Sequence, residues 1–120
     1  MISKAFYEFF IEKHACDERF IKMAQAMGMP DADKPEDFIT MLVNLQKACG
    51  VANLKMSDYG FTPDEFATLA TTAKETMGGL FLANPYELQH EECVELYRKS
   101  FRIFIKPVIV RGCLRVNFMF

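Results

Sequence analysis

Apolar side chains recur along most of this chain at the spacing of one face of an α-helix. The stretch 18–27 shows it most clearly, because four apolar residues there fall at positions i, i+3, i+4 and i+7. They are Phe20, Met23, Ala24 and Met27. Similar stripes predict helices over residues 36–49, 63–77 and 90–101. Together with the first stretch, they favour an all-α fold, a bundle of about five helices.

The first stretch, residues 4–13, is unusually apolar for a helix at a chain end. Its bulky apolar residues are Phe6, Phe9, Phe10 and Ile11. We expect such a face to be exposed in an isolated domain and to need a cover. Two interpretations stay open: the face packs against helices of a larger protein, or the helix docks in a groove of a partner.

Short polar residues, prolines and glycines predict where the helices begin and end. Ser3 and Asp17 are placed to cap the first two helices. Pro35 is a plausible first residue of the third helix, and Gly50 stands where a left-handed C-terminal cap would follow it. These signals define four helix boundaries before any tertiary contact is considered.

The clearest local signal lies at Thr62-Pro63-Asp64-Glu65. Thr62 and Glu65 have the spacing of a capping box, and Pro63 suits the first turn of a helix. The helix that begins there is expected to run to Met77 and to stop at Gly78-Gly79.

The last eighteen residues break with this pattern. Residues 103–120 are apolar and β-branched, with three basic residues and no acidic one. They predict an irregular or short-stranded tail. At 120 residues the chain is one domain at most, so we divide it into a helical domain, residues 1–102, and an atypical apolar basic tail, residues 103–120.

The charge distribution limits the kinds of partner that we expect this chain to bind. The basic residues of the tail are Lys106, Arg111 and Arg115. Residues 1–102 then hold eleven basic and sixteen acidic residues, a net charge of −5. An acidic body does not attract phosphate backbones, so we expect no nucleic-acid partner. We also expect no membrane span, because no apolar run is long enough.

The four cysteines are widely spaced and form no C-x-x-C pair. They are Cys16, Cys49, Cys93 and Cys113. With no secretory signal, this usage is typical of reduced thiols in a cytoplasmic protein, where a free Cys acts as a small hydrophobe.

Residues for catalysis or metal binding are scarce. No glycine-rich phosphate loop is present. His14 precedes Cys16, Asp17 and Glu18, whereas His90 precedes Glu91, Glu92 and Cys93, so neither histidine has the spacing of a preformed metal site. Adjacent carboxylates fall in the first turns of predicted helices, where the helix dipole explains them. We therefore assign no catalytic, cofactor-binding or metal-ligating residue.

Several short runs, taken in order, resemble a known enzyme family. They are KMSDYG (55–60), TPDEF (62–66), AKETMGG (73–79), NP (84–85) and CVELY (93–97). Their order and spacing are similar to the carboxy-terminal helical domain of iron-dependent (group III) alcohol dehydrogenases, the butanol dehydrogenase and lactaldehyde reductase relatives. The resemblance covers roughly residues 4–102.

The resemblance implies a fold and an activity. The fold would be the carboxy-terminal part of the dehydroquinate synthase-like helical domain. In the family an amino-terminal domain binds NAD or NADP, and one aspartate and three histidines hold Fe2+. Those ligands precede the matched segment. The parent enzyme would transfer a hydride between NAD(P) and a primary alcohol or aldehyde.

The resemblance assigns few of the family's functional residues to positions in this chain. The turn at Met77, Gly78 and Gly79 resembles one that approaches the substrate, which predicts a substrate-pocket wall. We interpret the chain as a truncated portion of such an enzyme, inactive alone and binding neither Fe2+ nor NAD(P) by itself. Its expected partner is the missing nucleotide-binding portion, or a second copy held through apolar helices. The alternative is a small helical protein-interaction module with no catalytic activity.

Overall fold

The structure, a computed structural model, describes residues 1–101, and within that part every regular element is helical. The α-helices are α1 (Ile2–Glu12), α2 (Asp17–Ala26), α3 (Glu36–Ala48), α4 (Phe66–Leu82) and α5 (His90–Phe101). Two short 3-10 helices, η1 (Met56–Tyr59) and η2 (Pro63–Glu65), precede α4. The predicted all-α bundle is confirmed. The predicted tail, residues 103–120, lies outside the described residues.

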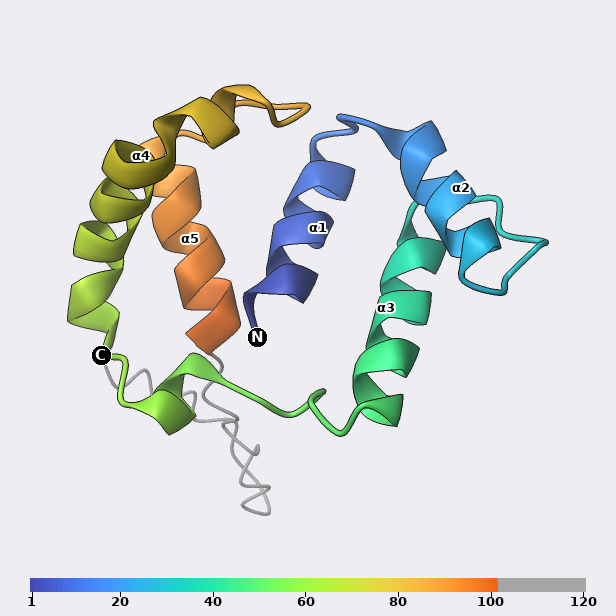
Figure 1. The fold of residues 1–120 in the computed structure, drawn as a ribbon, viewed down its shortest axis with the longest axis horizontal. Coiled ribbons are helices and arrows are strands. Elements are labelled where there is room, and N and C mark those ends of the chain that lie inside the picture. The colour runs from blue at the N-terminus through green and yellow to red at the C-terminus, as the bar shows by residue number, and fades with distance from the viewer. Residues whose placement is uncertain (102–120) are drawn as a thin grey trace, which may run out of the picture.

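Helix α1 occupies the middle of the arrangement. It packs against α5 on one side and α3 on the other, α2 packs on α3, and α4 packs on α5. Figure 1 shows the result as an open arc, with α4 and α5 at one end and α2 and α3 at the other. The two ends of the arc are therefore joined mainly through α1.

The main core surrounds α1. Phe9, Phe10 and Ile11 are buried, and the Phe6 ring lies 4.9 Å from that of Phe10 in an edge-to-face contact. Tyr7 makes a similar contact with Phe38 of α3 at 5.0 Å. The expectation that this apolar helix lacks a cover is therefore wrong, because α3 and α5 of the same chain supply it.

A second apolar cluster joins α4 to α5. Phe66 is buried, and its ring lies 6.2 Å from Tyr97 and 5.6 Å from Phe101. Ala70 and Cys93 are buried beside it in the same helix pair. Thus α5 has two apolar faces, one toward α1 and one toward α4.

Two predicted helix caps are wrong. Ser3 lies inside α1, which begins one residue after the chain start, and its Oγ accepts a hydrogen bond from Nε2 of Gln46 at 3.0 Å. Asp17 is the first residue of α2, and Cys16 is the N-cap. In both cases the polar side chain has a partner other than the backbone N–H groups that a cap would satisfy.

The predicted start of the third helix is off by one residue, because Pro35 is the N-cap, with helical φ and ψ, and α3 begins at Glu36. The predicted C-terminal cap is confirmed: Gly50 has a φ of 72°, the left-handed conformation expected after α3. The capping box is complete, with the Thr62 N–H donating to Oε2 of Glu65 at 2.7 Å.

The predicted helix stop at Gly78-Gly79 is wrong. Helix α4 continues to Leu82, and the irregularity falls instead at Met77, with φ −129° and ψ 26°. Neither glycine has a positive φ, so the two residues continue a bent helix. The bend separates a first part of α4, in which Phe66 contacts α5, from a short last part. In that last part Leu80 and Leu82 are exposed, whereas Phe81 is half-buried against the main core.

Candidate functional site

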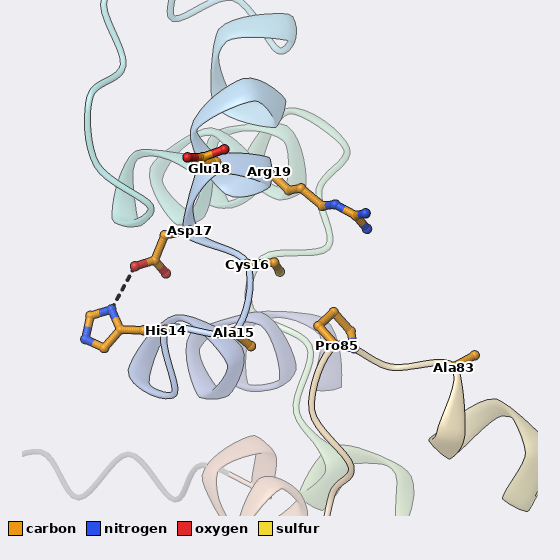
Figure 2. Close-up of a pocket in the computed structure, with 8 residues that line it drawn as sticks. All are labelled: His14, Ala15, Cys16, Asp17, Glu18, Arg19, Ala83 and Pro85. Carbon is orange, nitrogen blue, oxygen red and sulfur yellow. Dashed lines mark hydrogen bonds and ion pairs between the residues drawn. The ribbon is translucent and has the colours of Figure 1, made fainter.

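An open cleft of about 560 Å³ lies between the turn after α1 and the loop after α4. Figure 2 shows its lining residues. They are His14, Ala15, Cys16, Asp17, Glu18, Arg19, Ala83 and Pro85. An ion pair between Lys13 Nζ and Glu92 Oε1, 2.7 Å long, joins the end of α1 to the first turn of α5. This contact helps to bring the two walls of the cleft together.

The turn between α1 and α2 is closed by a side-chain contact. His14 has a φ of 51°, an uncommon conformation for a residue with a side chain. Its Nδ1 lies 2.8 Å from Oδ2 of Asp17 (Figure 2). The other oxygen, Oδ1 of Asp17, is buried without a hydrogen-bond partner among the described residues.

The thiol at the cleft, that of Cys16, is half-buried. Burial raises the pKa of Cys16, and nearby Arg19 offsets this only in part. A protonated thiol is a poor nucleophile and a poor metal ligand. Burial likewise raises the pKa of Cys93 between α4 and α5, whereas Cys49 is exposed at the end of α3. The prediction of free thiols is confirmed for these three, and Cys113 lies outside the described residues.

The described residues do not fit a metal centre. Within residues 1–101 no group of three or more His, Cys, Asp or Glu side chains is placed to hold an ion. His14 meets Asp17, and His90 meets Glu91 at 2.8 Å. Since a mononuclear site needs about three or four converging ligands, two-residue contacts of this kind do not amount to one.

The adjacent carboxylates have structural roles. Asp37 Oδ2 accepts from two backbone N–H groups of the preceding loop, and Glu65 completes the capping box. Glu92 binds Lys13 and also accepts from the Tyr86 hydroxyl at 3.0 Å. The acidic pairs of α2, α3 and α5 lie in first turns, as predicted.

The predicted pocket-wall residues lie on the far part of α4. Met77 is 57% exposed at the bend, and a Cβ added at Gly78 or Gly79 would meet no heavy atom within 4 Å. None of the three lines the cleft, to which this region contributes Ala83 and Pro85 instead. Their contact with a substrate stays a prediction.

Sequence reasoning missed the cleft as a whole. Arg19 and Ala83 line it and belong to no motif, and Pro85, part of the NP run, lines it without having been assigned to a site. Residues 19 and 83 are joined only through the packing of α1 on α5, so no local signal in the sequence could have paired them.

No helix among residues 1–101 combines the length and apolar character needed to cross a membrane.

The chain matches a protein-family model. Residues 5–101 match a family model described as "Fe-containing alcohol dehydrogenase family, C-terminal". No match is found among curated proteins or among solved structures.

Proposed function

Because this chain belongs to the Fe-containing alcohol dehydrogenase family, over the family's C-terminal part, we propose that it acts as the carboxy-terminal helical portion of such an enzyme. The enzyme would transfer a hydride between NAD(P) and a primary alcohol or aldehyde. The observation that carries the proposal is the family match over residues 5–101, together with the all-helical fold of the same residues.

Iron and the dinucleotide would be held by another portion of the enzyme. The lack of a fitting three-ligand set among residues 1–101 supports this division of labour, as does the lack of a glycine-rich phosphate loop in the sequence. We therefore propose that this chain alone does not oxidise alcohols. Its contribution would be a rigid helical body that closes the site.

The wall of the substrate pocket would be formed by Met77, Gly78 and Gly79. Two features support this assignment. The backbone bends at Met77, and both glycines leave open space beside α4, so another body can approach the backbone closely there.

A complementation experiment tests the proposal. The 120-residue chain is mixed with the purified amino-terminal, nucleotide-binding portion of a Fe-containing alcohol dehydrogenase, ferrous iron, NAD(P) and butanol. We expect NAD(P)H to form in the mixture and neither component to be active alone. Turnover by this chain alone would disprove the division of labour. A mixture that neither co-purifies nor reacts would disprove the proposed role.

A second candidate is a helical interaction module without catalytic activity. The helix first expected to dock, with Phe9, Phe10 and Ile11, is buried in the core. The observation that favours this candidate lies instead at the end of α4, where Leu80 and Leu82 are 61% and 72% exposed. Binding to an unrelated protein, lost in Leu80→Ser and absent for the amino-terminal portion of the enzyme, would favour the module.

We also propose a cytoplasmic location. The unpaired state of Cys16, Cys49 and Cys93 supports a reducing compartment. Fractionation of cells that express a tagged chain would test it, and recovery in a secreted fraction would contradict it.

A further inference from the structure

His90, the first residue of α5, contacts α4 through its ring. Its Nε2 lies 3.1 Å from Oγ1 of Thr71 and 3.3 Å from the carbonyl oxygen of Ala67, both in α4. Its Nδ1 lies 2.8 Å from Oε2 of Glu91. The imidazole therefore connects two helices near the loop that joins them.

All three partners present acceptors to the ring. A carbonyl oxygen such as that of Ala67 only accepts, and so does the ionised carboxylate of Glu91. The Thr71 hydroxyl donates its single proton to the same Ala67 carbonyl, at 3.0 Å. Only its lone pairs are then left for His90.

These acceptors determine which protonation state of His90 can donate hydrogen bonds on both sides of its ring. A neutral imidazole carries one N–H and could bind either Glu91 or the α4 acceptors, but not both. The imidazolium carries an N–H on each nitrogen and satisfies both sides. With the Thr71 hydroxyl donating to Ala67, as it does here, both sides of the ring are hydrogen-bonded only in the doubly protonated form.

We propose that His90 is a pH-dependent latch between α4 and α5, closed as the imidazolium and released when the ring loses a proton.

The groups around the ring both raise and lower the pKa of His90. The Glu91 carboxylate raises the pKa of His90 most, followed by the Ala67 carbonyl, whereas burial and Lys74 of α4 lower it. Lys74 lies 3.8 Å from Glu87 of the connecting loop, which offsets part of its charge. The positive end of the α5 dipole also opposes a cation at this position. The net direction is a raised pKa.

Protonation of His90 favours the closed state, so its contribution to stability falls as the pH rises. The unfolded state has the ordinary pKa of about 6.5. The opened state loses the Ala67 contact that raises the pKa of His90, so its pKa is lower than that of the closed state. The stabilisation is therefore fully present below about pH 6.5 and is lost as the pH rises through the pKa of the closed state. The hairpin itself should persist at high pH, because the Phe66 cluster with Tyr97 and Phe101 holds its other end.

The experiment is an NMR titration of the full 120-residue chain. The chain contains two histidines, so His14→Gln assigns the His90 ring signals. We expect His90 to titrate above about pH 6.5, and both Thr71→Val and Glu91→Gln to move its pKa back toward that value. A wild-type His90 that titrates at or below this value would overturn the proposal.

Amide hydrogen exchange supplies a second readout that a purely local role would not change. After correction for the intrinsic rate, opening of residues 71–90 should increase between pH 5.5 and 8.5. The increase should approach tenfold for each unit by which the pKa of His90 in the closed state exceeds its pKa in the opened state. His90→Gln should remove this dependence, whereas His14→Gln should retain it, because the ring of His14 bonds to Asp17 within its own turn. Equal pH dependence in wild type and His90→Gln would overturn the latch.

Discussion

At the scale of single residues, the two glycines of α4 differ from the glycines that end helices. Gly78 and Gly79 have no positive φ and leave open space around them. Gly50 also faces open space, but its φ of 72° is one that side chains disfavour. Packing among the described residues thus does not require glycine at residue 78 or 79. The backbone conformation at residue 50, in contrast, favours glycine.

Gly78→Ala and Gly79→Ala should therefore leave the free energy of unfolding unchanged or raise it by up to about 1 kcal/mol each, because Ala is the better helix former. Gly50→Ala is the matched control and should lower it by about 1 kcal/mol. Urea unfolding followed by circular dichroism measures all three. A clear loss of stability in Gly78→Ala would show that α4 depends on that glycine.

The same substitutions also test the proposed pocket wall. In the complemented enzyme, a methyl group at residue 78 or 79 should raise KM for the alcohol if the substrate lies against this segment. Gly50→Ala, distant in the fold, should leave KM unchanged. If both α4 variants had the same KM as wild type, residues 78 and 79 would not line the substrate pocket.

At the scale of elements, polar contacts at helix ends set how neighbouring helices meet. Glu92 connects α5 to the end of α1 through Lys13 and to the preceding loop through Tyr86. Lys13 also lies over the rings of Phe9 and Tyr86, at 5.2 and 5.0 Å. One carboxylate thus stabilises the junction that supports the cleft.

This junction should be sensitive to acid. Burial by itself would raise the pKa of Glu92, but hydrogen bonds from the Gln89 N–H, Lys13 and Tyr86 together lower it. The stabilisation is present above the unfolded-state pKa of about 4.3 and is lost as the pH falls through the lower folded-state value. We expect Glu92→Gln to show a weaker fall in Tm between pH 5 and pH 3 than wild type. Glu75→Gln, at an exposed position of α4, should retain the wild-type fall.

The start of α4 offers a second test at this scale. Thr62→Ala removes half of the capping box and should lower the free energy of unfolding by about 1 kcal/mol. Thr72→Ala, at an exposed position inside the same helix, should be neutral or slightly stabilising because Ala has the higher helix propensity. Equal effects of the two substitutions, measured by urea unfolding, would contradict a role for the cap.

At the scale of the whole molecule, stability depends on α1. It joins the α2–α3 end of the arc to the α4–α5 end (Figure 1), and its aromatic residues contact both. A cavity in this helix should therefore weaken the whole fold, and not one end alone.

Phe10→Ala tests this dependence. Phe10 is 3% exposed, and loss of a buried Phe costs about 3–5 kcal/mol. Leu80→Ala, at a residue 61% exposed, should change stability by no more than about 0.5 kcal/mol. If Phe10→Ala unfolded only α4 and α5 in hydrogen exchange, the central role of α1 would be wrong.

The sequence by itself determined the helices. Apolar spacing at i, i+3, i+4 and i+7 located all five, and the Thr62–Glu65 box and Gly50 located boundaries, because these signals act within one or two turns of the chain. Ser3 and Asp17 do not cap their helices, because their side chains bind Gln46 and His14. The sequence also shows that no glycine-rich phosphate loop is present, because such a loop is a contiguous motif.

Tertiary packing decided the rest. Phe9 and Phe10 are covered because α3 and α5 lie beside α1, and Arg19 faces the same cleft as Pro85 because α1 packs on α5. The continuation of α4 past Gly78-Gly79, with its bend at Met77, also had no local signal. Contacts between residues far apart in the chain depend on how helices are oriented, and the periodicity of a helix shows which face is apolar without showing which neighbour covers it.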